Sequence, residues 1–557
     1  MGIKEENVLA LLEIQTEDFG ERIALGMKGT YGWQEFTYKG VSLLAKKLAH
    51  HLVYDLEIPK GERLAILSES KPEYGACLFG SIISGLITVP LDVKLTKYEL
   101  SSILSSCLPT VMLVSQHYLD MALNLQKEVP SIKHIIVIDE NCHNDGIKNI
   151  YELPDNYNAK WRFRSSKSTA LIIYTSGTTG APKGVEITFK NIVAQLKDVK
   201  NAFQEVLPDR NVKTLSILPM NHLFELTVGF STFLHMGFSV YYTQSLKPKD
   251  ILSIMREKQI EFMIVVPAFL RLLKTTIEAN LKKSSTISQY KFKFLYHLAK
   301  FLPSYRVKKF LFRDIHEQFG GKFIGCLSGG APLDLPVARF FERVGIRVFQ
   351  GYGLSETSPV VSFNVKRYRD FSSVGPVMPQ FDARIDEKTG ELQLKGPSVM
   401  KGYYNQPELT AQAFTEDGWL HTGDIAKIEK NRYLYITGRI KNMIVLSGGK
   451  KVFPEEVESV LEKSEYLAEV CVIGQSRTFG AKDNTEEVVA VVVPQNTLYE
   501  EYSEQEVEDL VRKDLKVLLQ RLTPYKRPSN IIIRREGLPR TTTRKVKRRE
   551  VKELVAC

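Results

Sequence analysis

Residues 174–188, YTSGTTGAPKGVEIT, combine residue types that suit the binding of phosphate groups. Positions 175–184 hold three glycines, four hydroxyl residues and one lysine. Small residues let consecutive backbone N–H groups approach phosphate oxygens, hydroxyls add donors, and Lys183 supplies a cation. The segment therefore predicts a polyphosphate ligand. It does not match the GxxxxGK[ST] pattern, which disfavours a P-loop ATPase, and a flexible surface loop would be the default if it stood alone.

Further segments with characteristic polar residues follow in order along the chain. They are LPMNHLFE (218–225), LSGGAPL (327–333), GYGLSET (351–357), GWLHTGD (418–424), YLYITGRIKN (433–442), SGGKKVFPEEVE (447–458) and LPRTTTRK (538–545). With the phosphate segment, this ordered set resembles the adenylate-forming (AMP-binding) superfamily, and within it the long-chain fatty acyl-CoA synthetases. In that superfamily a carboxylate attacks the α-phosphorus of ATP and expels pyrophosphate, and a thiol then displaces AMP from the acyl-adenylate.

The resemblance implies a role in ATP binding for several motif residues. The phosphate segment would cradle the β- and γ-phosphates, and Glu356 would help to hold Mg²⁺, a hard cation suited to carboxylate and phosphate oxygens. Tyr352 would offer its ring to adenine, Asp424 would accept hydrogens from both ribose hydroxyls, and Arg439 would support the ribose. Taken singly, these residues could be ordinary core, surface or turn residues, and their joint placement favours the ligand roles. The full set is Thr175, Ser176, Gly177, Thr178, Thr179, Lys183, Gly330, Ala331, Pro332, Gly351, Tyr352, Thr357, Asp424 and Arg439.

The same resemblance assigns the acyl site and the catalytic residues. His222 would meet the substrate carboxylate, although a lone histidine beside apolar residues is usually a satisfied core group. The acyl and thiol site would contain Leu223, Phe224, Val228, Gly229, Gly448 and Gly449. Each methylene buried in an apolar tunnel contributes roughly 0.8 kcal/mol, so long acyl chains would gain most. Lys545 would be catalytic together with His222 and Glu356, and Lys441 would be the hinge of a mobile C-terminal domain.

Three residues depart from the pattern of that superfamily. Phe189 stands where a histidine is usual, Asn442 replaces a common aspartate beside the hinge, and Arg544 stands where a glycine often precedes the final lysine. None of these changes removes a charge that the adenylation chemistry needs. Arg544 adds a cation, which would favour an acidic carrier protein over free CoA as the acceptor.

The hydrophobic pattern predicts the elements that position these residues. Apolar runs such as ERLAILSES, TVMLVSQ, HIIVIDE, TALIIYTSG, EFMIVVPA and KFIGCLSGG each predict a buried strand leading into a loop and then a helix. This is the pattern of parallel α/β sheets, whose ligand loops leave the carboxyl ends of the strands. Residues 383–404 alternate with period two and predict antiparallel strands. The expected fold is a large N-terminal domain (1–441) with parallel α/β sheets and a β-rich subdomain, plus a small mobile α+β C-terminal domain (442–557).

Composition indicates an enzyme-sized cytoplasmic protein. The chain has 557 residues, and its six cysteines show neither a CxxC pair nor metal-ligand spacing, as expected of reduced thiols. The N-terminus lacks the features of a secretory signal. Residues 75–91 and 224–242 are apolar enough to be considered as membrane spans, but the first is short and the second carries Glu225 and His235, so we expect buried helices.

The net charge of +11 is concentrated in two segments. Residues 281–313 and 521–557 each carry a net charge of +9, which implies an anionic partner or surface. Between positions 291 and 312 aromatic and aliphatic residues alternate with lysine and arginine, as in helices that lie in an anionic membrane surface. A solvated face around a packed helix pair explains the pattern equally well, because Pro303 interrupts it.

We therefore expect ATP- and Mg²⁺-dependent activation of a medium-to-long-chain fatty acid as acyl-AMP, followed by transfer to CoA. The nearest alternative is a ligase that transfers the fatty acid to acyl carrier protein. From other classes, a basic nucleic-acid-binding protein or a non-catalytic nucleotide-binding scaffold would leave the ordered motifs unexplained. The expected localisation is cytoplasmic, with weak contact to the inner face of the membrane.

Substitutions at Lys545 and Lys441 should separate the two half-reactions. Lys545→Ala should slow acyl-adenylate formation by about 10² or more, because it removes a cation that offsets the charge of the carboxylate and the α-phosphate. Thioester formation from supplied acyl-AMP should change much less. Lys441→Pro should fix the hinge, so that adenylate forms but transfer to the thiol fails. Pyrophosphate exchange and thioester assays measure the two steps, and equal impairment of both steps in both variants would contradict an alternating domain.

Overall fold

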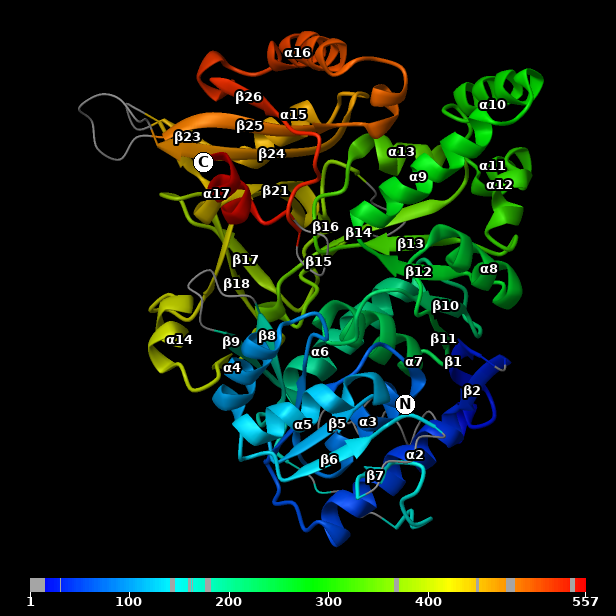
Figure 1. The fold of residues 1–557 in the computed structure, drawn as a ribbon, viewed down its shortest axis with the longest axis vertical. Helices are drawn as coiled ribbons and strands as arrows, with labels where there is room; N and C mark the ends of the chain where they lie inside the picture. Colours follow the sequence, from blue (N-terminus) through cyan, green and yellow to red (C-terminus); the bar gives the residue numbers. More distant parts are fainter. Residues whose placement is uncertain are drawn as a thin grey trace.

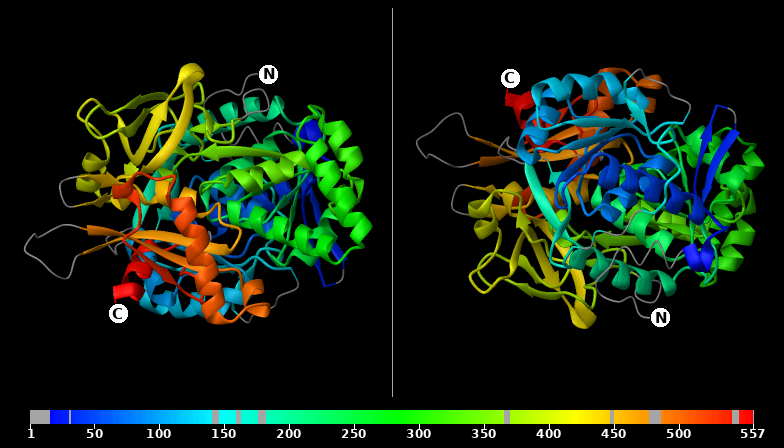
Figure 2. Two further views of the ribbon diagram at one scale, coloured as in Figure 1. Left: turned by 90° about the horizontal axis from the view of Figure 1, so that it is seen from above. Right: turned by 90° about the horizontal axis from the view of Figure 1, so that it is seen from below.

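The computed structural model describes residues 16–30, 32–140, 146–158, 162, 164–175, 182–364, 370–446, 450–476, 486–540 and 546–556. Within these ranges the chain forms two large α/β sheets, a β-rich subdomain and a C-terminal α+β domain (Figure 1). Figure 2 shows the β-rich subdomain and the C-terminal domain at one end of the molecule, with the helices that follow residue 248 on the opposite side.

The first large sheet has the strand order β15-β14-β13-β12-β10-β11-β1-β2. Strands β10 to β14 run parallel, as does β1 beside β11, while β2 and β15 are antiparallel edges. Strand β12 is buried along its whole length, which explains its continuous apolar sequence FMIV. The strands are β1 (Ile23–Gly29), β2 (Gly32–Thr37), β10 (Lys213–Ser216), β11 (Ser239–Tyr242), β12 (Phe262–Val265), β13 (Gly325–Ser328), β14 (Arg347–Tyr352) and β15 (Ser362–Phe363).

Helices between β11 and β14 pack on this sheet and form the second largest hydrophobic core. They are α8 (Pro248–Lys258), α9 (Pro267–Lys282), α10 (Thr286–Leu298), α11 (Tyr305–Leu311), α12 (Arg313–Gln318) and α13 (Leu335–Arg343). Residues 299–304 separate α10 from α11, so the predicted break at Pro303 is confirmed.

The second large sheet has the order β19-β9-β8-β4-β3-β5-β6-β7. Its strands are β3 (Arg63–Leu67), β4 (Ile87–Pro90), β5 (Val111–Val114), β6 (His134–Val137), β7 (Lys148–Asn149), β8 (Thr169–Thr175), β9 (Lys183–Thr188) and β19 (Gly402–Tyr403). Strand β8 does not lead into a helix as predicted, because β9 returns antiparallel beside it. The phosphate segment therefore lies between two paired strands. The helices of this half are α2 (Tyr38–His50), α3 (Pro72–Ile83), α4 (Lys97–Cys107), α5 (Leu119–Glu128) and α6 (Phe189–Gln204).

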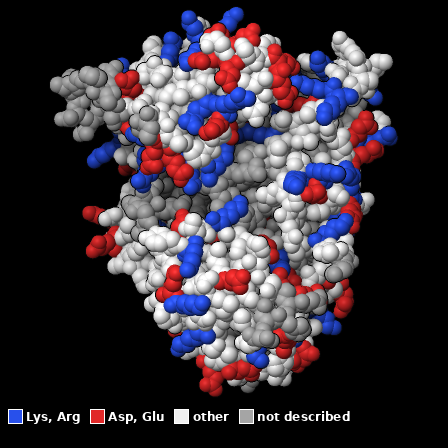
Figure 3. All heavy atoms as spheres, in the orientation of Figure 1, with Lys and Arg blue, Asp and Glu red and all other residues white. Residues whose placement is uncertain are grey.

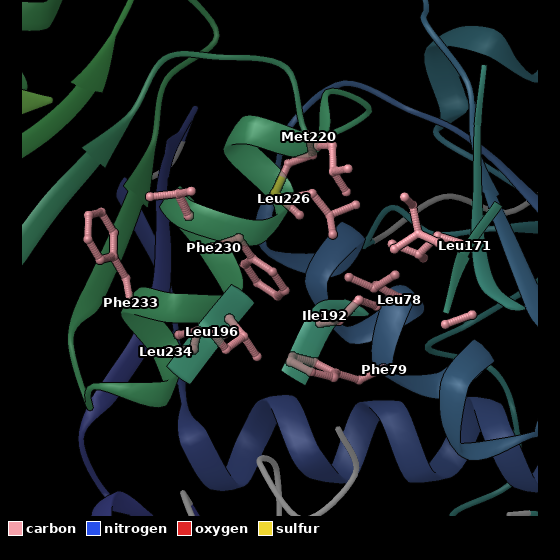
Figure 4. Packing of buried hydrophobic residues seen from close by; sticks show 14 of the residues in the cluster. Leu78, Phe79, Leu171, Ile192, Leu196, Met220, Leu226, Phe230, Phe233 and Leu234 are labelled. Carbon is pink, nitrogen blue, oxygen red and sulfur yellow. The ribbon is translucent and has the colours of Figure 1, made fainter. Parts of the chain in front are cut away.

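A π-helix, η3 (Phe224–Thr232), continues into α7 (Phe233–His235) and packs between the two halves. Figure 4 shows its residues Leu226 and Phe230 directed toward α3 and α6, where the Phe230 ring lies 5.4 Å from that of Phe79. The apolar segments 75–91 and 224–242 are each a buried helix followed by a buried strand rather than helix throughout. Across the described residues, no helix is both long and apolar enough to cross a membrane.

The β-rich subdomain is the predicted antiparallel unit, with the strand order β16-β21-β20-β18-β17. Its elements are β16 (Gly375–Pro376), β17 (Asp382–Ile385), β18 (Glu391–Lys395), α14 (Pro407–Ala413), β20 (Leu420–Ile428) and β21 (Tyr433–Arg439). The C-terminal domain follows with its own core. It contains β22 (Ile444–Val445), β23 (Lys451–Val452), α15 (Pro454–Leu461), β24 (Leu467–Ser476), β25 (Glu486–Pro494), α16 (Glu504–Leu519), β26 (Asn530–Ile533) and α17 (Arg548–Ala556).

Candidate active site

The motifs of the large domain follow neighbouring parallel strands of the first sheet. LPMNHLFE follows β10, IVVPAFL begins in β12, LSGGAPL begins in β13, and GYGLSET begins at the end of β14. These four strands are adjacent in the order β14-β13-β12-β10 and share one direction. Their carboxyl ends therefore meet along one edge of the sheet, as in the ligand sites of other open α/β sheets. The fold gathers segments that are more than 130 positions apart in the sequence.

The turn that follows β13 (residues 329–332) leaves an open space, the slot, beside Gly330. Gly330 has a φ of +81°, which favours glycine, and a Cβ atom at this position would meet nothing within 4 Å. Ala331 and Pro332 are exposed beside it. At Gly329 a Cβ atom would come within 2.8 Å of the Phe224 ring, so Phe224 packs directly against this turn. Small residues thus leave this turn open, and the adenine contact predicted here stays a prediction.

A buried carboxylate of the β-rich subdomain lies beside the end of β14. Asp424 on β20 and Arg439 on β21 are cross-strand partners, and Arg439 Nε lies 2.7 Å from Asp424 Oδ1. The Tyr352 hydroxyl at the end of β14 donates to Asp424 Oδ2 at 2.5 Å. Asp424 is only 1% exposed, and burial together with this carboxylate raises the pKa of Tyr352. The structure therefore brings together three of the predicted nucleotide residues and holds a carboxylate where ribose hydroxyls could donate to it.

The phosphate segment lies outside the described residues between Thr175 and Pro182, so the positions of Ser176, Gly177, Thr178 and Thr179 are not described. Its two ends are fixed, because Thr175 on β8 and Lys183 on β9 are cross-strand partners. The Lys183 ammonium lies 5.8 Å from the centre of the Tyr403 ring. Lys183 is half-buried beside the predicted phosphate loop.

Tyr403 links this lysine to the predicted metal-binding acid. Its hydroxyl donates to Glu356 Oε1 at 2.9 Å, and the Met400 N–H donates to the Glu356 carbonyl at 2.8 Å. Burial and the Glu356 carboxylate raise the pKa of Tyr403, which keeps it a neutral donor. The same residue pairs with Val185 through β19 and β9. Tyr403 thus connects the phosphate strands of the second sheet to the end of β14 in the first.

Three of the predicted site residues are more buried than expected. Thr357 was predicted to contact ATP, but it is buried and its hydroxyl contacts the backbone of Leu354 and Pro359. This bonding holds the short turn η4 (Ser355–Thr357) that presents Glu356. Leu223 and Val228 belong to the main hydrophobic core, whereas His222 and Phe224 are partly exposed at the nucleotide slot.

Glu225 is a buried carboxyl group that the motif analysis did not assign to the site. It is 1% exposed on η3, and its carboxylate folds back against Gly229, where an added Cβ atom would lie 2.4 Å from Oε1. Burial raises the pKa of Glu225 to about 8, and a smaller, opposing contribution comes from a hydrogen bond with Ser216 at the end of β10. The group is therefore protonated at neutral pH and can donate a hydrogen bond.

The link to the C-terminal domain runs through η7 (Ile440–Asn442). Lys441, the predicted hinge, is exposed there, and the Asn442 side chain donates to Glu455 of α15 at 2.6 Å. Lys545, Arg544, Gly448 and Gly449 lie outside the described residues. Hydrogen bonds to Thr96 lower the pKa of Glu99 on α4. The positive charge of Lys547, two positions after Lys545, makes a smaller contribution to the same lowering.

Family comparison agrees with this architecture. Residues 12–404 match the model of the AMP-binding enzyme family, and residues 456–545 match the AMP-binding enzyme C-terminal domain. The chain belongs to the AMP-binding enzyme family. Its predicted membership of the adenylate-forming superfamily is thereby confirmed, and the class of AMP-forming acyl-CoA ligases is supported.

Relatives of this AMP-binding enzyme differ in the substrate for which they are named. A long-chain-fatty-acid–CoA ligase of Bacillus subtilis is 28% identical over 99% of this chain and 95% of its own length. A luciferin 4-monooxygenase of Photinus pyralis is 27% identical over 88% of this chain and 84% of its own. The crystal structure of the anthranilate CoA ligase AuaEII superposes with a TM-score of 0.79 at 20% identity, covering 99% of this chain and 98% of that one. This likeness confirms the predicted fold class.

Tyr403→Phe should weaken the connection between Glu356 and the phosphate strands. The variant keeps the ring beside Lys183 and removes only the hydroxyl that donates a hydrogen bond to Glu356. We therefore expect roughly tenfold slower pyrophosphate exchange with little change in thermal stability. Tyr404→Phe is the matched control, since no side-chain hydrogen bond of Tyr404 is present among the described contacts. Equal rates in the two variants would contradict a role of the Tyr403 hydroxyl.

Glu225→Gln should change how stability depends on pH. The folded-state pKa of Glu225 is about 8, whereas an unfolded glutamate titrates near 4.3, so the folded state retains a proton that the unfolded state loses. The contribution of Glu225 to the stability of the wild type is fully present below the pKa of the unfolded state. It is lost as the pH rises through about 8. Relative to the neutral glutamine, the wild type should lose about 3 kcal/mol between pH 5 and pH 8. Melting curves at several pH values test this, with exposed Glu416→Gln as control.

Proposed function

We propose that this protein activates a medium-to-long-chain fatty acid with ATP, giving acyl-AMP and pyrophosphate, and transfers the acyl group to CoA. The observation that carries the proposal is the convergence of the His222, Gly330 and Tyr352 segments at the carboxyl edge of one parallel sheet. Asp424 of the β-rich subdomain lies beside the same edge, at the end of β14. One nucleotide and one acid can therefore be held side by side.

The first half-reaction requires that two anions approach each other. Lys183 and, in the proposal, Lys545 supply positive charge at the phosphates, and backbone and hydroxyl groups of the phosphate segment supply donors. Asp424 accepts from the ribose hydroxyls while Arg439 fixes its carboxylate. Tyr352 anchors the same carboxylate and places its ring at the slot.

Glu356 is the candidate ligand for Mg²⁺. It is partly exposed and presents carboxylate oxygens, the ligand type that Mg²⁺ prefers. Among the described residues, no group of three or more His, Cys, Asp or Glu side chains is placed to hold a metal ion. Mg²⁺ would therefore take most of its ligands from phosphate oxygens and water, and it would neutralise phosphate charge when bound.

The second half-reaction is assigned to a domain movement about Lys441, with the large domain ending at residue 441. Lys441 is exposed in η7, so no buried side chain at this position opposes rotation of the backbone. The Asn442 contact with Glu455 would hold one arrangement. Gly448 and Gly449 are proposed to approach the thiol, because small residues leave room for a narrow pantetheine chain.

Two observations favour a fatty acid as the substrate. The Bacillus subtilis ligase, named for long-chain fatty acids, aligns with nearly the full length of this chain. In addition, His222 and Phe224 at the slot lead directly into the apolar helix η3. The partly exposed Phe224 ring offers an apolar contact, and such contact favours an acid in proportion to the methylene groups that it buries.

A panel of acids assayed by pyrophosphate release tests the substrate. Acids from C4 to C24, malonate and an aromatic acid should be compared at saturating ATP, and rates should rise with chain length into the medium or long range. CoA and acyl carrier protein are then offered as acceptors in parallel. Faster turnover of malonate or the aromatic acid would overturn the fatty-acid assignment, and acylation of carrier protein alone would overturn the assignment of CoA.

A further inference from the structure

Helix α10 has apolar side chains on two opposite faces. On the inner face, Phe292, Leu295 and Tyr296 pack against the second core, where Phe292 stacks on Tyr296 at 5.7 Å and contacts Phe312 at 5.6 Å. The inner face therefore anchors the helix. The outer face contacts none of this core, and no residue of α10 is fully buried.

The outer face carries a continuous apolar stripe. Ile287, Tyr290, Phe294 and Leu298 follow the helical spacing i, i+3, i+7 and i+11, so they lie along one side of α10. Ile287 is 81% exposed, Tyr290 70% and Phe294 69%. Two phenylalanines of the following segment are also exposed, Phe301 at 77% and Phe310 of α11 at 75%. Most of the exposed phenylalanine surface of the described chain is thus concentrated on this corner of the molecule.

The surroundings of this stripe are basic. Between positions 281 and 313 the sequence holds nine lysine and arginine residues and no acid. Lys291, Lys293 and Lys300 are exposed beside the stripe. In Figure 3 the corner at the upper right, where Figure 1 places α10, is uncharged at its tip and edged by basic side chains.

The structure corrects which basic residues face outward. Lys308 and Lys309 belong to the basic segment 281–313, for which an anionic partner or surface is predicted, but Lys308 is only 9% exposed and Lys309 is half-buried. The backbone of α11 lies against Gly345, where an added Cβ atom would come within 2.8 Å of the backbone nitrogen of Lys309. Arg313 pairs with Glu317 at 3.2 Å. Within the described part of the chain, the exposed cations without an ion pair at this corner are therefore Lys282 and Lys283 before α10, Lys291 and Lys293 on it, and Lys300 and Arg306 after it.

We propose that α10 and α11 form a docking surface for an anionic lipid membrane, with α10 lying in the plane of the interface. Exposed aromatic residues flanked by lysines match the two features of an interfacial helix, apolar insertion and attraction to anionic headgroups. A protein partner with an acidic apolar groove and a second copy of this chain are the alternatives. Like charges would repel across a symmetric contact of this basic surface, which disfavours the second copy.

Vesicle binding of the full-length protein tests the proposal. Sedimentation with vesicles of phosphatidylcholine containing about 30% phosphatidylglycerol should retain the wild type, and raising NaCl from about 0.1 to about 0.5 M should release it. Lys291→Gln, Lys293→Gln and Lys300→Gln combined should weaken partitioning roughly 100-fold, about fivefold per lysine. Phe294→Gln with Phe301→Gln should weaken it by at least about tenfold, because both rings are exposed and available for insertion.

Matched variants separate local from general effects. Lys127→Gln, Lys513→Gln and Lys516→Gln remove three exposed charges elsewhere, and Tyr98→Gln with Val517→Gln removes two exposed apolar side chains elsewhere. These controls should bind as the wild type does. Melting temperature and pyrophosphate exchange should be unchanged in all variants, because none of the altered residues belongs to the nucleotide site.

Three outcomes would overturn the proposal. Unchanged vesicle binding in both α10 variants would exclude this surface, and equal binding to neutral and anionic vesicles would exclude recognition of charge. Self-association of the wild type in size-exclusion chromatography without lipid, abolished by Phe294→Gln and Phe301→Gln, would assign the stripe to contact between copies. Because binding is measured without turnover, it is independent of which acid the enzyme activates.

Discussion

Parallel pairing of β10, β12, β13 and β14 is the constraint on which the site depends. Adjacent strands lie about 4.8 Å apart, so the loops that leave their carboxyl ends are fixed within a few ångströms of one another. The register is set by continuous backbone pairing, such as Ile264 with Leu327 and Leu327 with Phe349. These side chains are buried, and a slip by one residue would turn them to the opposite face. Hydrophobic burial thus fixes the positions of polar residues that contribute little to the core.

The second constraint is the connection between the two large sheets. The phosphate strands β8 and β9 belong to one sheet and Glu356 follows a strand of the other, so sheet pairing alone cannot align them. Residues 400–404 make the connection. The Met400 N–H and the Tyr403 hydroxyl donate to Glu356, while the N–H groups of Lys401 and Tyr404 donate to carbonyls of β9. Without this segment, the distance between Lys183 and Glu356 would depend only on packing between the two halves.

The sequence predicted those parts of the fold that local patterns determine. Runs such as VMLV and FMIV identify buried parallel strands, because both faces of these strands are covered and no polar position interrupts them. The prediction of a helix after β8 was wrong. The chain instead returns along β9 in antiparallel pairing, which no local sequence pattern encodes. For the same reason motif position predicted that Thr357 lies near the nucleotide, but not that its hydroxyl turns inward to the Leu354 backbone.

Long-range partners explain the residues that sequence reasoning missed. Tyr403 lies on a two-residue strand whose partner, β9, precedes it by more than 200 positions. The period-two pattern of residues 383–404 predicted strands over a range that includes Tyr403, but nothing in the sequence indicated its pairing with β9 or its bond to Glu356. Glu225 was noticed as an acid in an apolar run, yet its protonated state follows from burial of its carboxyl group against Gly229, which requires the folded structure. Lys308 likewise appeared exposed until the backbone of α11 was seen against Gly345.

The basic surface and the nucleotide slot are built by one continuous excursion of the chain. Strand β12 ends at Val265, α9 begins two residues later, and the chain returns to β13 at Gly325 after completing α10, α11 and α12. Helix α9 packs against α13, whose first turn follows the Gly330 slot, and Arg271 of α9 is paired with Asp334 at that turn. Tyr296 of α10 contacts Phe340 of α13 at 5.9 Å. The outer stripe is therefore carried by rigid helices packed on the strands that form the slot, so a surface bound by α10 would hold the slot in a defined orientation rather than tether it through a flexible linker.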